Sequence, residues 1–353
     1  MLLKKYQSES FDESFVRSAP MAPTSKRVGV LLINLGTPDA PEPAAIRRYL
    51  AQFLSDPRVV ELPAVLWQPI LRTLVLGLRP RKLAPRYQSI WLPEGAPLLI
   101  YSEQQVSALQ QLLDDQGLDV QVALGMRYGT PSIAHGFEQL RGRGCQRILV
   151  VPLYPQYAAS TTATAIDEIG RLLGQLRRQP EVRYINSFCV HPGYIGPLAS
   201  VIRKYWEKHG VPERLLLSFH GIPKQSVVDG DPYHMECMQT RYALEQALME
   251  YGVPVYHSFQ SRFGAAKWLQ PYTEPLLKQW AQEGVENIHV ACPGFVVDCL
   301  ETLEEIDVEY REVFLQAGGK QFGYIDCLNA KPEWIQGLAQ LVREQLEGWV
   351  SST

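Results

Sequence analysis

The chain has 353 residues, a length that favours two domains, each large enough for its own hydrophobic core. Hydrophobic residues make up 46% and charged residues 20% of the sequence, as in an ordinary globular enzyme, which excludes a collagen, a coiled coil and a fully disordered chain. The 34 basic and 37 acidic side chains leave a net charge of −3, so no global basicity points to a nucleic acid as partner.

Six cysteines are spread along the chain without a CxxC pair. This spacing is typical of reduced thiols in a cytoplasmic protein and argues against a structural zinc site. Residues 1–25 contain no apolar run of signal-peptide type and no cleavage pattern, and their acidic residues argue against a transit peptide. We therefore expect residues 1–25 to form a loosely ordered leader.

Short apolar runs rich in β-branched residues alternate with amphipathic stretches of helical period. This alternation predicts an α/β fold in which helices cover both faces of parallel sheets. The expected strands are Val28–Asn34, Val120–Gly125, Ile148–Leu153, Leu215–Phe219, Val255–Phe259 and Ile288–Cys292.

The second half of the chain repeats motifs of the first half in the same order. LLINLGTP at Leu31 is similar to LLSFHGIP at Leu216, and YINSFCVHPGYI at Tyr184 is similar to YIDCLNAKPEWI, 140 residues later. A duplicated unit is the simplest account, and independent use of the same residue types in strands and turns is the alternative. We expect two related α/β domains, at residues 26–200 and 201–353, the second ending in a C-terminal helix.

The first half is about 50 residues longer than the second between its first two strands. This insertion, at about residues 40–100, holds the most apolar long segment, Val59–Leu78, followed by a basic run. Arg72 near its middle would cost about 2.5–3.5 kcal/mol in a bilayer, so the segment does not span a membrane. Composition favours a helix packed in the core, whereas the position beside a strand end favours an exposed lip for a hydrophobic ligand or a membrane surface, and both interpretations stay open.

His220 is the leading candidate for a catalytic base. In open parallel sheets, ligands bind outside the carboxyl ends of the strands, so residues that directly follow a strand are the first candidates. Of the seven histidines, only His220 follows a strongly apolar strand and precedes a glycine. A strand-end histidine is often a satisfied core residue, but in a crevice between two domains its pKa of about 6.5 suits a proton acceptor.

Carboxylates recur on a predicted helix that begins near Cys299. Glu301, Glu305 and Glu309 follow one another at i, i+4 and i+8, so they share one face, where crowding favours a cation or a proton among them. For Glu309 we prefer the interpretation of a solvated helix face. Asp298 and Glu301 would also complement a helix N-terminus, but the position of Glu301 at the strand-to-helix junction makes it a candidate for chemistry.

No dinucleotide-binding motif, P-loop or nucleophile elbow follows any expected strand. What remains is one base, an acidic stripe, the pair Arg127 and Tyr128, and many aromatic residues. This set suits a large, flat, apolar ligand with acidic tails. Arg127 fits either a contact with such tails or a structural ion pair.

Several motifs, in order, resemble those of the ferrochelatase family over about Val28 to Trp334. They are LLINLGTP, GMRYGTP, LYPQYAASTT, LLSFHGIP, FQSRFGAAKWLQP and CPGFVVDCLETLEEID. Members of this family insert Fe²⁺ into protoporphyrin IX to form protohaem, the terminal step of haem biosynthesis. The resemblance implies a class II chelatase-like fold, with two similar Rossmann-like domains, each a parallel sheet flanked by helices, and the porphyrin in the cleft between them.

The resemblance also implies roles for individual residues. His220 and Glu301 match the catalytic and metal-handling histidine and glutamate of the family, and Asp298 and Glu305 match its acidic path. The insertion matches the family's hydrophobic lip. The positions that match its porphyrin pocket are Leu35, Arg127, Tyr128, Tyr154 and Trp268.

Two departures from the family pattern qualify these roles. Many relatives carry a histidine where this chain has Cys299, which weakens the expectation of a metal ligand there, and many have a methionine in place of Leu35. We expect no resident cofactor, because Fe²⁺ is a substrate. We expect no iron–sulfur cluster either, because animal members hold theirs through cysteines of a C-terminal extension, whereas this chain ends EQLEGWVSST after Cys327.

The expected partners are Fe²⁺ and protoporphyrin IX, with coproporphyrin as the alternative substrate, and no nucleic acid. The protein is expected in the cytoplasm, either free or peripheral on the inner face of the membrane, and its oligomeric state is left open. A haem or porphyrin carrier would share the apolar cleft and the lip but needs no base that faces an acid. A cobalt or sirohydrochlorin chelatase would share the fold but needs a wetter, more basic pocket, and the apolar lip argues against it.

Overall fold

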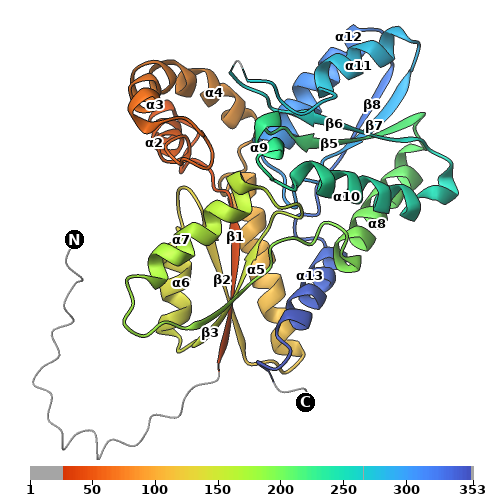
Figure 1. The fold of residues 1–353 in the computed structure, drawn as a ribbon. Coiled ribbons are helices and arrows are strands. Elements are labelled where there is room, and N and C mark those ends of the chain that lie inside the picture. The colour runs from red at the N-terminus through yellow and green to blue at the C-terminus, as the bar shows by residue number, and fades with distance from the viewer. Residues whose placement is uncertain (1–26, 265, 351–353) are drawn as a thin grey trace, which may run out of the picture.

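The computed structural model describes residues 27–264 and 266–350, and the expected leader lies outside them. The described chain forms two four-stranded parallel sheets with the orders β2-β1-β3-β4 and β6-β5-β7-β8, flanked by helices (Figure 1). The second order repeats the first strand for strand. The prediction of an α/β fold with two similar parallel sheets is confirmed.

The elements follow one another in chain order within each half. The first half contains β1 (Val28–Asn34), α2 (Pro43–Phe53), α3 (Ala64–Ile70), the π-helix η1 (Leu71–Val75), α4 (Leu76–Ile90), α5 (Pro97–Asp115), β2 (Val120–Met126), α6 (Ile133–Gly142), β3 (Arg147–Pro152), the π-helix η2 (Ala159–Ala163), α7 (Thr164–Leu173), β4 (Glu181–Tyr184) and α8 (Pro192–His209). The second half contains β5 (Arg214–His220), α9 (Lys224–Val228), α10 (Tyr233–Ala247), the 3₁₀-helix η3 (Met249–Tyr251), β6 (Val255–Gln260), α11 (Thr273–Gln282), β7 (Asn287–Ala291), the π-helix η4 (Leu300–Tyr310), α12 (Arg311–Gln316), β8 (Gln321–Ile325) and α13 (Pro332–Gln345).

Each of the six apolar runs expected to be strands overlaps a strand, with Leu153 and Cys292 one residue beyond the strand ends, and each sheet has one further strand. These are β4 and β8, which lie at equivalent edges of the two sheets. β4 has the polar sequence EVRY, and all four of its residues keep some contact with solvent, so it lacks an apolar run. The sequence analysis predicted neither of these two strands.

The central strand of the first sheet is buried on both faces, as expected for a parallel sheet. Leu31 and Ile33 of β1 pack with residues of α6 and α7 on one face. Val30 and Leu32 point to the opposite face, where residues of α5, α8 and α13 cover them. The alternation follows from the two-residue period of a strand.

The two halves share one core. Although α13 follows the second sheet in the chain, it packs against α5 and α8 of the first half (Figure 1). The hydrophobic cluster that covers Val30 and Leu32 also contains Leu217 and Phe219 of β5. The domain boundary expected after residue 200 falls inside α8, which contacts both α10 and α13.

The insertion forms the helical arm α2 to α4, which stands at the carboxyl ends of the strands of the first sheet (Figure 1). Leu71 and Leu76 are buried in a small cluster with Ile46 and Tyr128. The outer face of the same arm is apolar and exposed, so the insertion is both a packed helix and an exposed lip. We call the exposed residues the lip residues: Leu62, Val65, Leu66, Ile70, Leu74 and Leu78, which keep 46–85% of their surface in contact with solvent.

Candidate functional site

The loops after β1 and β2 meet at the carboxyl end of the first sheet. The backbone N–H of Tyr128 donates to the carbonyl oxygen of Leu35 at 2.8 Å. Gly36 has a φ of +111°, and a Cβ atom at this position would lie 1.7 Å from the carbonyl oxygen of Tyr128. Only glycine fits such an approach, so the GTP turn seen in the sequence joins the two strand ends.

The loop after β5 positions His220 with a defined proton arrangement. Its Nδ1 atom lies 2.6 Å from the carbonyl oxygen of Gly221. A carbonyl oxygen only accepts hydrogen bonds, so Nδ1 carries the proton and Nε2 keeps its lone pair. No hydrogen bond joins Nε2 to a described residue, and the ring is partly buried.

Trp268 packs against the loop that follows β5. A Cβ atom on Gly221 would lie 3.1 Å from the ring of Trp268, so the indole packs directly over this glycine. The indole N–H donates to the carbonyl oxygen of Phe263 at 3.1 Å, and only 6% of Trp268 is exposed. The structure thus places Trp268 against the glycine that directly follows His220.

Glu305 lies within electrostatic reach of both His220 and Glu301. Its carboxylate accepts hydrogen bonds from the backbone N–H of Ser261 and the hydroxyl of Tyr310, both at 2.8 Å, and from the hydroxyl of Ser261. Burial raises the pKa of Glu305 above its ordinary value even though these donors oppose the shift. A base and a carboxylate pair therefore share one region, on β5 and η4.

Ser261 and Gln260 hold η4, which we call the acidic helix, against the second sheet. Ser261 has a φ of +63°, a conformation that is uncommon for a residue with a side chain, and its backbone and hydroxyl both donate to Glu305. The amide of Gln260 donates to the backbone oxygen of Glu301 at 2.7 Å. Nothing in the spacing of the sequence indicated this contact or the role of Gln260.

Glu301 lines a narrow pocket between the lip and η4. Leu35, Tyr49, Tyr87 and Cys299 line the same pocket. Burial raises the pKa of Tyr87 well above its ordinary value, and the charge of Glu301 raises it further. Leu35 and Glu301, which lie far apart in the sequence, therefore line the same pocket in the structure.

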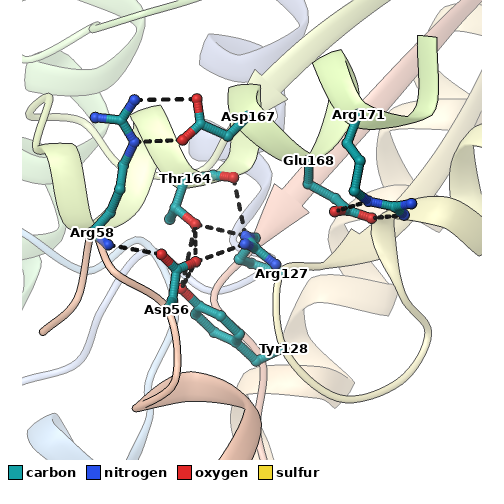
Figure 2. Close-up of polar contacts among 8 residues, drawn as sticks. All are labelled: Asp56, Arg58, Arg127, Tyr128, Thr164, Asp167, Glu168 and Arg171. Atoms are coloured by element: carbon teal, nitrogen blue, oxygen red, sulfur yellow. Dashed lines mark hydrogen bonds and ion pairs between the residues drawn. The ribbon is translucent and has the colours of Figure 1, made fainter. Parts of the chain in front are cut away.

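Arg127 and Tyr128 point into a polar network with Asp56 (Figure 2). Nη2 of Arg127 lies 2.6 Å from Oδ2 of Asp56, and its Nε donates to the hydroxyl of Thr164 at 2.7 Å. The hydroxyl of Tyr128, which is 1% exposed, donates to the same oxygen of Asp56 at 2.9 Å. Of the two interpretations of Arg127, the structure shows the ion pair, and Asp56 is a residue that sequence reasoning missed.

Asp298 is also saturated by protein donors. It accepts from Thr302 at 3.0 Å, from Asn329 at 2.6 Å and from the hydroxyl of Tyr324, and it is 3% exposed. These bonds tie the start of η4 to the loop after β8. Asp298 therefore stands beside the acidic helix as a fully bonded carboxylate, whereas Glu301 faces the pocket.

Two further predicted residues have distinct surroundings. The hydroxyl of Tyr154 is buried and has no hydrogen-bond partner among the described residues, and burial raises its pKa well above its ordinary value. Glu309, expected on a solvated face, pairs with Arg86 of α4 at 2.9 Å, and Arg86 also lies 3.2 Å from Glu304. The helical arm and η4 are thus in direct contact.

Within residues 27–264 and 266–350, no group of three or more histidine, cysteine, aspartate or glutamate side chains is arranged to hold a metal ion. The six cysteines are all buried and free. None of the described helices has the length and apolar character needed to cross a membrane.

Solved structures of chelatases share this fold. SirB from Bacillus subtilis with Fe³⁺ superposes with a TM-score of 0.51 at 15% identity, over 91% of this chain and 98% of that chain. The sirohydrochlorin chelatase SirB from Bacillus subtilis subspecies spizizenii, in complex with cobalt, gives 0.51 at 14% identity, over 91% and 96%. At such low identity these likenesses establish the fold alone, which is that of the class II chelatases.

Sequence comparison identifies the family. The ferrochelatase family model matches residues 27–346. Ferrochelatases of Bordetella parapertussis, Bordetella bronchiseptica and Bordetella pertussis are each 54% identical over 323 residues, which cover 92% of this chain and 89% of each relative. The chain belongs to the ferrochelatase family and is a chelatase, a lyase.

Proposed function

We propose that this chain inserts Fe²⁺ into protoporphyrin IX to form protohaem, with His220 as the acceptor of pyrrole protons and Glu301 and Glu305 as the groups that handle metal and protons. The hydrogen bond from Nδ1 of His220 to Gly221 carries the proposal. It leaves Nε2 as an available base beside a carboxylate pair, an arrangement that a porphyrin carrier would not need.

The chemistry requires each of these groups. A porphyrin loses two pyrrole protons for each Fe²⁺ that it takes up, so the ring stays neutral while two protons leave the site. His220 accepts one proton at a time at Nε2 and passes it to Glu305, which lies within its electrostatic reach. Carboxylate oxygens of Glu301 and Glu305 are hard ligands that attract Fe²⁺ yet release it to pyrrole nitrogen.

We propose that the porphyrin contacts Leu35, Tyr154 and Trp268, while Arg127 and Tyr128 hold the wall behind it. This structural role for Arg127 and Tyr128 is based on the ion pair of Arg127 with Asp56 and on the burial of Tyr128. A rigid wall lets the binding energy of the apolar ring edges sustain a bent macrocycle, which exposes the nitrogen lone pairs to the ion.

An anaerobic assay of the purified protein with Fe²⁺ and either protoporphyrin or coproporphyrin, followed by the Soret band, tests the proposal. We expect turnover by the wild type and none by His220→Ala, which still binds porphyrin. Glu301→Gln should behave nearly the same. A His220→Ala protein with full turnover would contradict the assignment of the base.

We also propose that the lip lies on the inner face of the cytoplasmic membrane. Six exposed apolar side chains lie on one arm, beside the exposed Arg81 and Lys82 and the partly buried Arg79. This is the pattern of a peripheral helix on an anionic surface. The enzyme would then receive a poorly soluble porphyrin directly from the membrane. We expect it to work without a resident cofactor, and an iron–sulfur absorption band in the purified protein would contradict this.

A further inference from the structure

Gln260, the last residue of β6, lies directly beside His220, the last residue of β5, in the second sheet. The backbone oxygen of Gln260 accepts a hydrogen bond from the backbone N–H of Gly221 at 2.8 Å. The carbonyl oxygen of Gly221 is the atom that faces Nδ1 of His220. The backbone of Gln260 therefore holds the loop that sets the proton arrangement of His220.

The side chain of Gln260 reaches both residues of the carboxylate pair. Its Nε2 atom donates to the backbone oxygen of Glu301 at 2.7 Å and to Oε2 of Glu305 at 3.3 Å. Only 2% of Gln260 is exposed, so this residue acts on a ligand through its neighbours. One buried residue is thus bonded on one side to the loop of the base and on the other side to both carboxylate residues.

The amide of Gln260 has one defined orientation. A backbone oxygen only accepts hydrogen bonds, so the amide atom that faces the backbone of Glu301 is the nitrogen. The amide oxygen Oε1 accepts from the hydroxyl of Ser218, a fully buried residue of β5, at 2.7 Å. A flipped amide would lose this bond and would turn its oxygen towards two other oxygens. The hydroxyl of Ser218 therefore keeps the amide in the orientation that donates to the acidic helix.

The internal repeat provides a comparison for this network. In LLINLGTP, Ile33 and Leu35 stand where LLSFHGIP has Ser218 and His220, yet both halves form sheets of the same strand order. The fold therefore does not require a buried hydroxyl at this position. A buried polar group costs free energy unless it is hydrogen-bonded, so an apolar residue would serve the sheet equally well. The contact between Ser218 and Gln260 is accordingly a property of the site and not of the fold.

We propose that Gln260 is a positioning residue for iron insertion, and that Ser218 fixes its amide so that the base and the carboxylate pair keep one spacing. This inference rests on the proposed function, because the spacing matters only if protons and Fe²⁺ are handled between His220 and the pair Glu301 and Glu305. A shift of about 1 Å in reacting groups can cost roughly a hundredfold in rate. Gln260 itself exchanges no proton and binds no metal.

Iron insertion by Gln260→Met tests the central contact. Methionine has a similar length but no N–H donor, so the acidic helix loses its bonds to the residue that holds the loop of His220. We expect kcat to fall roughly tenfold to a hundredfold. The dissociation constant of protoporphyrin, measured by quenching of protein fluorescence, should stay within about twofold of the wild-type value, because Gln260 is buried. A variant with the kcat of the wild type would overturn the proposal.

Two buried serines form a matched pair of variants. Ser218 and Ser258 are partners in the register of β5 and β6, both are 0% exposed, and each hydroxyl lies within 3.0 Å of the hydroxyl of Thr273. Of the two, Ser218 is the one that bonds to Gln260. We expect Ser218→Ala to lower kcat roughly threefold to tenfold and Ser258→Ala to leave it unchanged, although both should lower Tm. An equal loss of kcat in both variants would show a general loosening of the sheet and overturn the proposal.

A double variant tests whether Ser218 acts through Gln260. Combining Ser218→Ala with Gln260→Met should give the kcat of Gln260→Met alone, because no amide is left to orient, and additive losses would contradict this route. If Gln260→Met does not fold, the contrast between the two serine variants decides. An inactive wild type contradicts the proposed function itself, whereas an active wild type with a fully active Gln260→Met contradicts only the positioning role.

Discussion

Nη2 of Arg86, on α4, lies 2.9 Å from Oε2 of Glu309, on η4. Nη1 of the same arginine lies 3.2 Å from Oε2 of Glu304. This one guanidinium therefore joins the helical arm to the C-terminal half of η4. Glu304 in turn lies within electrostatic reach of Glu301 and Glu305. A cation of the protein thus stands where an incoming metal cation would be attracted.

Replacing Arg86 should change the apparent affinity for metal more than that for porphyrin. In Arg86→Gln the acidic helix loses a nearby positive charge, so we expect the KM for Fe²⁺ to fall roughly threefold to tenfold, with the KM for porphyrin unchanged. Arg81→Gln, an exposed arginine on the same helix, is the control. An unchanged KM for Fe²⁺ would show that the pair with Glu309 is only structural.

Asp56→Asn should destabilise the fold in a way that depends on pH. Burial alone would raise the pKa of Asp56, but hydrogen bonds from Thr164, the backbone of Arg58 and Tyr128, together with the charge of Arg127, hold it below its ordinary value of 3.8. A lowered pKa in the folded state stabilises the protein above pH 3.8, and this stabilisation is lost as the pH falls through the folded-state pKa.

At neutral pH, Asp56→Asn leaves the buried charge of Arg127 without its partner, which costs about 3 kcal/mol. Urea unfolding of wild type and variant at pH 7 and at successively lower pH measures the difference. We expect the two stabilities to converge as the solution becomes acidic. A constant difference at every pH would mean that the asparagine acts through packing and not through charge.

Ser261→Gly should shift the acid limb of the pH–rate profile. Glycine keeps the backbone at its positive φ but removes the hydroxyl that donates to Glu305, and a carboxylate that loses a donor has a higher pKa. The acid limb of kcat/KM should therefore move to higher pH, with activity near neutrality largely retained. Ser261→Ala removes the same hydroxyl and keeps the Cβ atom that Ser261 already carries at this φ, so it should move the limb in the same direction. An unmoved limb would exclude Glu305 from the rate-determining ionisation.

Leu66→Glu with Leu74→Glu should abolish binding of the protein to anionic liposomes. These two lip residues are 64% and 58% exposed, so the changes remove apolar surface without disturbing the core. Each lost leucine weakens partitioning by about 1.5–3 kcal/mol, roughly tenfold or more. Leu71 is unsuitable for this test, because it is 1% exposed and its replacement would unfold the arm.

The control for membrane binding is Leu315→Glu on α12, which removes an exposed leucine far along the chain from the lip. Cosedimentation should also weaken as salt rises, because the basic residues of the arm contribute through screened charges. Binding to neutral and anionic vesicles alike, or full binding by the double variant, would contradict a role for the lip at a membrane.

The sequence was most informative where burial imposes a period. Continuous apolar runs predicted six of the eight strands, the inner strands β1, β3, β5 and β7 among them, because a parallel strand covered on both faces must be apolar throughout. The repeated motifs predicted that the two sheets are alike. β4 escaped prediction because an edge strand of four residues needs no apolar run.

The candidate site was predictable in part for the same reason. His220 is the last residue of an apolar strand, so its place at the carboxyl end of the second sheet could be predicted from the sequence. Asp56 carries no such signal, since its partner Arg127 lies 71 residues away in the sequence and only the folded chain brings them together. Likewise, the spacing of leucines on the arm did not show that Leu71 faces inward and Leu74 outward, because the π-helical turn alters the helical period there.

The place of α13 has a consequence for biosynthesis. This helix covers α5 and α8 of the first half, yet it is the last helix of the described chain to leave the ribosome. Until residues 332–345 emerge, apolar side chains such as Leu109 and Leu198 lack part of their cover in the nascent protein. Chaperones that shield hydrophobic surface during translation would therefore be needed until synthesis is nearly complete, although the first sheet is made early.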